Sequence, residues 1–156
     1  MFFDQANDPE YRQFVQQIVQ TQTVYALYSP EEDELAQCPS AYFEDADGEA
    51  AVVYCLWANA ELAAQCQHEE WANHIIESVS LEILLHNWLR DMHQTNALIG
   101  MNFDAQLYGA EIEPMALLGD LLNEASEQGV HIAQFDELMH QHLAWEREAA
   151  GQSLLN

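Results

Sequence analysis

The chain has 156 residues, of which 27 are acidic and only three are basic (Arg12, Arg90 and Arg147), so its formal net charge is −24 at pH 7. It contains no Lys. This composition excludes sequence-independent binding to nucleic-acid phosphates and docking on anionic membranes, because Lys and Arg supply the attraction in both cases. Apolar residues make up 49% of the chain, which is enough for one domain with a sizeable core and is not typical of a disordered protein.

Apolar periodicity and end signals predict the secondary structure in chain order. Asp8 and Pro9 are typical of a helix start, and Gly129 is typical of a helix end. The Asp47-Gly48 turn predicts a hairpin. The expected helices span 9–21, 60–67, 81–94, 114–128 and 132–149, and the expected strands span 24–28, 41–44, 50–57, 74–79, 97–103 and 108–112.

These elements predict an α+β fold with a mainly antiparallel or mixed sheet of about five or six strands, flanked by helices. We expect a single domain over residues 1–128. Residues 129–156 are expected to form a C-terminal helical extension that packs on the same domain.

The three cysteines, Cys38, Cys55 and Cys66, are 17 and 11 residues apart, which matches neither a redox CxxC pair nor a zinc knuckle. We interpret them as reduced thiols of a cytoplasmic protein. The first residues lack the basic and apolar regions of a signal peptide, in agreement with that expectation. Cys66 lies near His68, but a cysteine at the C-terminal end of a helix is poorly placed to form a thiolate.

Motifs for common enzyme chemistry are missing from the sequence. There is no GxSxG, phosphate-binding GxxxxGK[ST] or GxGxxG motif, and the HExxH pattern of zinc helices is also absent. His86 and His93 share a predicted helix face but lie about 10 Å apart along its axis, too far to bind one metal ion comfortably. We therefore predict no catalytic residue, no metal ligand set and no cofactor.

Four residues are the candidates for a weak binding site: Trp57, Trp71, Asn102 and Glu111. The two tryptophans follow a predicted strand and a short helix, where they would either pack in the core or line a groove. Trp88 lies on a stripe of leucines and is expected to pack in the core. If the four candidate residues converge in the fold, a ligand site between them is plausible.

From Tyr11 to Leu122 the chain resembles the bacterial family catalogued as domain of unknown function 2750. The resemblance is carried by several short segments in a characteristic order and spacing. They are Thr23-Val24-Tyr25-Ala26-Leu27, Asp47-Gly48-Glu49, Ala60-Glu61-Leu62-Ala63, Ser80-Leu81-Glu82, Trp88-Leu89, Leu98-Ile99-Gly100-Met101-Asn102 and Gly109-Ala110-Glu111-Ile112-Glu113-Pro114.

The chain departs from the family pattern at two strands, with Tyr25 in place of Trp and Cys55-Leu56-Trp57 in place of Pro-Val-Trp. The family is similar in layout to the N-terminal module of SseB-type proteins. This resemblance implies a small α+β domain and implies no activity.

Together these features predict a non-catalytic acidic interaction domain. Its expected partner is a basic protein, or a second copy that docks through residues 132–149. One alternative is a metal-binding protein or metal-dependent hydrolase that uses dispersed His and carboxylate groups. A nucleic-acid mimic or toxin inhibitor is another, and the acidic residues would serve solubility alone in a third.

Overall fold

The computed structural model describes residues 8–45 and 47–155. The expected domain boundary at residue 1 and the chain end at residue 156 lie outside these described residues. Within them, no helix combines the length and the apolar character that crossing a membrane requires.

The secondary structure follows the predicted order closely. The strands are β1 (Thr23–Ser29), β2 (Glu34–Leu35), β3 (Gln37–Glu44), β4 (Ala50–Leu56), β5 (Ile75–Ser80), β6 (Leu98–Met101) and β7 (Ala110–Ile112). The helices are α1 (Pro9–Thr21), α2 (Ala60–Ala64), α3 (Leu81–Ile83), α4 (Leu89–Gln94), α5 (Pro114–Gln128) and α6 (Phe135–Leu155), with a 3₁₀ turn at Glu69–Trp71. The predicted α+β class is therefore confirmed.

Local signals explain most of the helix boundaries. The Asp8 carboxylate accepts hydrogen bonds from the first amides of α1, and Asn59 and Ser80 do the same for α2 and α3. Gly129 ends α5 in the left-handed conformation (φ 72°), which a residue without a Cβ adopts readily. These ends lie within a few residues of the predicted ones because capping depends on local sequence.

The strands form two sheets rather than the expected one. The first has the order β2-β1-β5 and is antiparallel, and the second has the order β3-β4-β6-β7. In the second sheet β4 and β6 are parallel, while β3 and β7 pair antiparallel to their neighbours. A single bridge between Tyr25 and Trp57 joins the two sheets.

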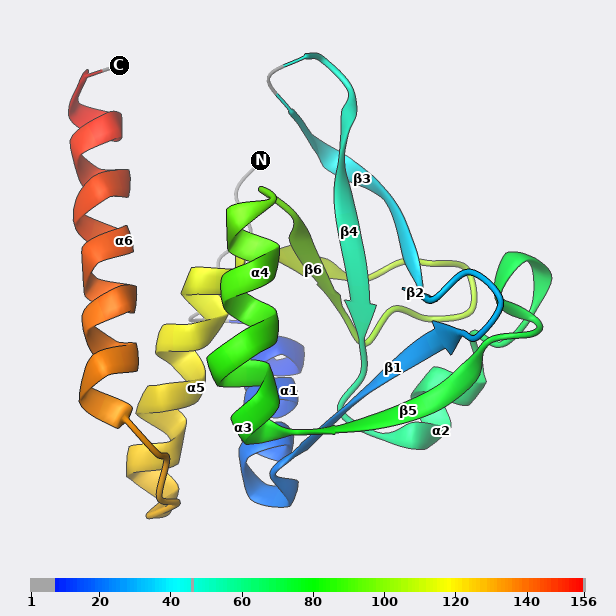
Figure 1. Cartoon of the computed structure of the whole chain (residues 1–156), viewed down its shortest axis with the longest axis horizontal. Coiled ribbons are helices and arrows are strands. Elements are labelled where there is room, and N and C mark those ends of the chain that lie inside the picture. The colour runs from blue at the N-terminus through cyan, green and yellow to red at the C-terminus, as the bar shows by residue number, and fades with distance from the viewer. Residues whose placement is uncertain (1–7, 46, 156) are drawn as a thin grey trace.

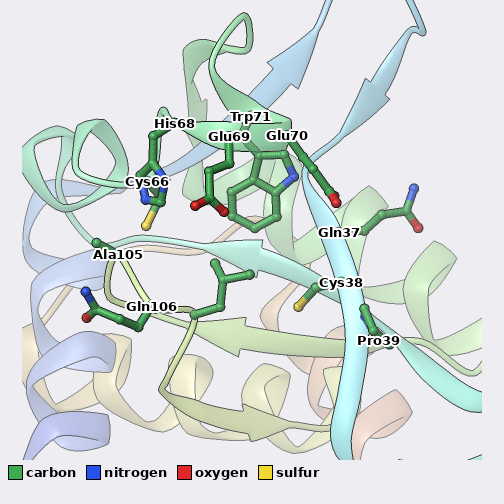
Figure 2. A pocket seen from close by; sticks show the side chains of 11 residues that line it. Gln37, Cys38, Pro39, Cys66, His68, Glu69, Glu70, Trp71, Ala105 and Gln106 are labelled. Carbon is green, nitrogen blue, oxygen red and sulfur yellow. The ribbon is translucent and has the colours of Figure 1, made fainter.

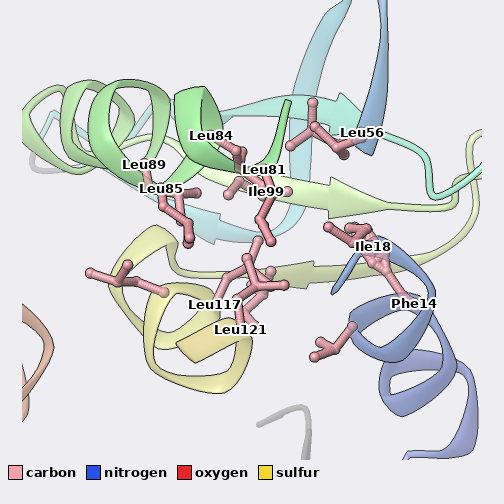
Figure 3. Close-up of a cluster of buried hydrophobic side chains, with 14 of the residues drawn as sticks. Phe14, Ile18, Leu56, Leu81, Leu84, Leu85, Leu89, Ile99, Leu117 and Leu121 are labelled. Carbon is pink, nitrogen blue, oxygen red and sulfur yellow. The ribbon is translucent and has the colours of Figure 1, made fainter. Parts of the chain in front are cut away.

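The helices α1, α4, α5 and α6 lie on one side of the molecule and the strands on the other (Figure 1). The main core fills the space between them, with Phe14 and Ile18 from α1, Leu117 and Leu121 from α5, and Ile99 from β6 (Figure 3). A second, smaller cluster of buried residues lies on the opposite face of β4 and β6. From Val53 to Leu56, successive β4 residues alternate between the two clusters, as the period of a strand requires.

The predicted helix over 81–94 has an irregular centre. Residues Leu84–Trp88 form a π-helical turn between α3 and α4, and such a wider turn changes the direction of the side chains that follow. Trp88, which we expected in the core, is only partly buried and packs at its edge. The leucines of the same stripe, such as Leu85 and Leu89, are buried as expected.

The C-terminal helix α6 packs along α5, with Leu138 buried against the main core. It begins at Phe135, three residues after the predicted start, and continues past residue 149. His142 packs tightly on α5, because its ring lies directly over Gly119 and its Nδ1 donates to the Met115 carbonyl oxygen at 2.8 Å.

Candidate functional site

The second core cluster is organised around Trp57, which immediately follows β4. Its side chain is fully buried, and its indole Nε1 donates a hydrogen bond to the Phe103 carbonyl oxygen at 2.9 Å. Trp71 meets it edge to face, with ring centroids 6.3 Å apart, a geometry that aromatic pairs favour. The two tryptophans are thus in contact although 13 residues separate them in the sequence.

Asn102 lies beside Trp57 because β4 and β6 are parallel, so that the residues following each strand meet at the same sheet edge. Its backbone amide donates to the Leu56 carbonyl, and its side-chain oxygen accepts from the Ala58 amide, each at 2.9 Å. Its φ of 48° is in the left-handed region, which Asn tolerates better than most residues. In this position Asn102 ties together the chain segments that leave the two strands.

Glu111 occupies a different place in the fold. It is in β7, where only 7% of it is exposed, and one carboxylate oxygen accepts from the Ala41 amide at 3.0 Å. The other oxygen accepts from the Ser40 hydroxyl. Because Ser40 also accepts from the Tyr42 and Phe43 amides, Glu111 anchors the irregular second half of β3.

Of the four candidate residues, Trp57 and Trp71 are therefore in contact, Asn102 lies next to Trp57 at the same sheet edge, and Glu111 lies apart, in β7 beside β3. Trp71 lines a hollow. This hollow, about 530 Å³ in volume, lies between β3, the segment after α2 and the loop before β7 (Figure 2). We call it the Trp71 hollow and define it by Cys38, Cys66, Glu69, Glu70, Trp71 and Leu107.

Two cysteines face the Trp71 hollow from opposite sides (Figure 2). Cys66 is buried, and its thiol lies 3.3 Å from the Phe103 carbonyl and 3.4 Å from that of Asp104. Burial raises the pKa of Cys66, so this thiol stays protonated and hydrogen-bonded. Cys38, on β3, is only half-buried, and its sulfur lies 3.9 Å from that of Cys55 on β4.

A second hollow, of about 340 Å³, lies between β2, β4 and α4. We call it the Trp88 hollow. It combines two partly buried aromatic rings, Tyr54 and Trp88, with the carboxylates of Asp33, Glu34 and Asp91. Asp33 is held in place by the Tyr28 hydroxyl, which donates to it at 2.5 Å.

Neither the Trp88 hollow nor the Cys38–Cys55 contact is predicted from the sequence. Trp88 is the last residue of the π-helical turn and is only partly buried, and no residue pattern in that helix indicates this turn. The Asp47-Gly48 hairpin signal makes β3 and β4 neighbours, but it does not give the register in which Gln37 to Pro39 pair with Val52 to Tyr54. The predicted strand covers only 41–44, so Cys38 falls outside it, whereas β3 begins at Gln37.

The described residues contain no group of three or more His, Cys, Asp or Glu side chains arranged to hold a metal ion. No curated protein and no solved structure matches the chain. A family of proteins of unknown function, DUF2750, matches residues 11–121, which is most of the chain. The chain therefore belongs to the DUF2750 family.

Proposed function

We propose that the protein is an acidic interaction domain that binds a basic segment of a partner protein through the Trp88 hollow. The observation that carries this proposal is the lining of the hollow, where two aromatic rings and three carboxylates surround one concave surface. No Lys or Arg lines it. A cationic side chain is the ligand group that matches both the charge and the aromatic faces.

The aromatic rings add a cation–π attraction to the negative charge of this surface. Arg or Lys over the face of Trp88 or Tyr54 gains about 0.5–1 kcal/mol at an exposed site, and an exposed ion pair with a carboxylate adds about as much. Each contribution is small. Useful affinity therefore requires a partner segment with more than one basic residue.

The position of Gln37 supports a segment of that kind. Gln37 lines both the Trp88 hollow and the Trp71 hollow, so the two hollows lie next to each other along β3. The Trp71 hollow adds the carboxylates of Glu69 and Glu70 beside an aromatic ring. An extended basic segment that crosses Gln37 would meet carboxylates on both sides.

The carboxylates of the Trp88 hollow have little neutralisation from basic side chains of the chain itself. Among the described residues, Arg90 is the only Arg in an ion pair with a carboxylate; its Nε lies 3.8 Å from Asp91, and both side chains are more than half exposed. A basic partner must displace only this weak contact. A second copy of the chain is the less favoured partner, because two molecules with a net charge of −24 repel each other.

The proposal is tested by titrating Arg- and Lys-containing peptides into the protein at low and at physiological salt. Binding should weaken steeply with salt, and peptides with Glu in place of the basic residues should not bind. The variant Glu34→Gln/Asp91→Asn should lower the affinity several-fold. Its matched control is Glu127→Gln/Glu148→Gln, which removes the same charge from exposed positions on α5 and α6.

Equal losses in the two double variants would show that only net charge matters, and the hollow would then have no specific role. Trp88→Leu separates the aromatic contribution, because it keeps an apolar side chain at the core edge and leaves the net charge unchanged. An unchanged affinity in Trp88→Leu would contradict the role given to the ring.

A further inference from the structure

The contact between Cys38 and Cys55 joins two neighbouring strands on one face of the sheet. In the register of β3 and β4, Cys38 lies opposite Val53, so Cys55 is its diagonal neighbour. Their sulfur atoms are 3.9 Å apart and both thiols are free. The pair is thus within one small movement of a covalent bond.

The two thiols differ in their access to solvent. Cys38 lines the Trp71 hollow, whereas only 1% of Cys55 is exposed. A reagent in the hollow therefore meets Cys38 first, and Cys55 is reached only through Cys38. Cys66 also borders the hollow, but its thiol faces two backbone carbonyls rather than another sulfur.

The sulfur–sulfur hydrogen bond also shifts the pKa values of the two thiols in opposite directions. It lowers the pKa of Cys38, against the opposing effects of burial and of the Glu111 carboxylate. The same hydrogen bond, together with burial, raises the pKa of Cys55. Cys38 is consequently the better nucleophile, since the thiolate is the reactive form of a cysteine.

We propose that Cys38 and Cys55 form a peroxide-reactive dithiol that closes to a disulfide. The Cys38 thiolate attacks one oxygen of hydrogen peroxide and breaks the O–O bond, giving a sulfenic acid and hydroxide, which takes up a proton to become water. Cys55 then attacks the sulfenic sulfur, and the hydroxyl group leaves as a second water with the Cys55 proton. Two thiols are oxidised to one disulfide and one peroxide is reduced to two waters.

Closing the bond requires the sulfurs to approach by about 2 Å, since a disulfide is about 2.05 Å long. β3 is an edge strand, and its pairing with β4 is irregular between Pro39 and Glu44, directly after Cys38. β3 can therefore shift toward β4 without disturbing an inner strand of the sheet.

The charges around the hollow select the oxidant. Glu69 and Glu70 line it and Glu111 lies near both thiols, so an anionic reagent such as oxidised glutathione is repelled on approach. Hydrogen peroxide is neutral and small enough to enter. This proposal is independent of the proposed binding of basic segments, because it concerns the thiols and not the carboxylates of the Trp88 hollow.

The experiment treats the full chain with a modest excess of hydrogen peroxide at neutral pH and follows the intact mass under non-reducing conditions. We expect a product lighter by two hydrogen atoms, restored by dithiothreitol, with Cys38 and Cys55 linked in the peptide map. Cys66→Ser should form the same product, whereas Cys38→Ser should not. In Cys55→Ala, a sulfenic acid at Cys38 should persist and be trapped by dimedone.

Three results would overturn the proposal. These are a gain of oxygen atoms with no loss of hydrogens in the unmodified chain, a disulfide that involves Cys66, and equal rates with hydrogen peroxide and with oxidised glutathione at matched concentration. Circular dichroism of each variant identifies a variant that fails to fold. The peptide map of the unmodified chain decides the connectivity without any variant.

Discussion

Gly119 provides the sharpest test of how α6 is held on α5. A Cβ built at this residue would lie only 2.3–2.5 Å from three atoms of the His142 ring, closer than any real contact. That ring is restrained because Nδ1 donates to the Met115 carbonyl and Nε2 lies 3.2 Å from a Glu146 oxygen. Gly119→Ala should therefore push α6 away from α5.

The expected magnitude follows from opposing contributions to the free energy of unfolding. Replacing Gly by Ala inside a helix stabilises by about 1 kcal/mol. Overpacking costs about 1–3 kcal/mol, and loss of the His142 hydrogen bond costs about 1 kcal/mol more. We expect Gly119→Ala to be less stable than the unmodified protein by about 2 kcal/mol.

Urea unfolding measures this change, and hydrogen exchange of the α6 amides shows where it acts. The decisive comparison repeats the substitution in a His142→Ala background, where no ring occupies the space above Gly119. There the sign should reverse, and Gly119→Ala should stabilise by up to about 1 kcal/mol. If Gly119→Ala stabilises the protein in both backgrounds, the close packing of α5 and α6 is refuted.

Three further predictions concern buried polar groups. Trp57→Phe removes the Nε1 donor to the Phe103 carbonyl and shortens a fully buried side chain, so unfolding in urea should show a loss of about 2–3 kcal/mol. Glu111→Gln places an amide donor against the Ala41 amide or the Ser40 hydroxyl, and faster hydrogen exchange of β3 should accompany a loss of about 1–2 kcal/mol; unchanged exchange would argue against the anchor. Burial raises the pKa of Asp120, although the hydrogen bond from Tyr11 acts in the opposite direction. Ionised Asp120 thus costs stability at neutral pH, and the protein should gain stability relative to Asp120→Asn as the pH falls through this raised pKa toward the unfolded value of about 3.9; a difference that is constant with pH would contradict this.

The two proposals concern neighbouring surfaces and can be separated experimentally. Binding of basic segments depends on the carboxylates and rings around Gln37, whereas the redox reaction depends on the sulfurs of Cys38 on β3 and Cys55 on β4. Peptide binding should persist in Cys38→Ser. Disulfide formation should likewise persist in Glu34→Gln/Asp91→Asn.

Local sequence was sufficient for most of the helix boundaries and for the order of the longer strands. The Asp8 cap, the Asp47-Gly48 turn and Gly129 act within a few residues of the chain, so they predicted element ends without knowledge of the fold. Apolar periodicity identified the buried faces of α1 and α5 for the same reason, since it records only which side of a helix meets the core. The short strand β2 was missed because two residues carry no periodicity.

Pairing between distant strands lies beyond such local signals. The parallel pairing of β4 and β6 brings Trp57 and Asn102 together, and the pairing of β3 and β4 brings Cys38 and Cys55 into contact. Neither neighbour can be recognised from spacing in the chain, since pairing register depends on how whole strands bury their faces.

Composition and order along the chain thus determined the acidic character, the α+β class and the element boundaries, because charge and capping belong to individual residues and their immediate neighbours. Tertiary structure alone decided which carboxylates surround an aromatic ring, which thiols meet and which tryptophan reaches the surface. Those contacts join segments that the chain keeps far apart, and packing of the two sheets against the helices brings them together.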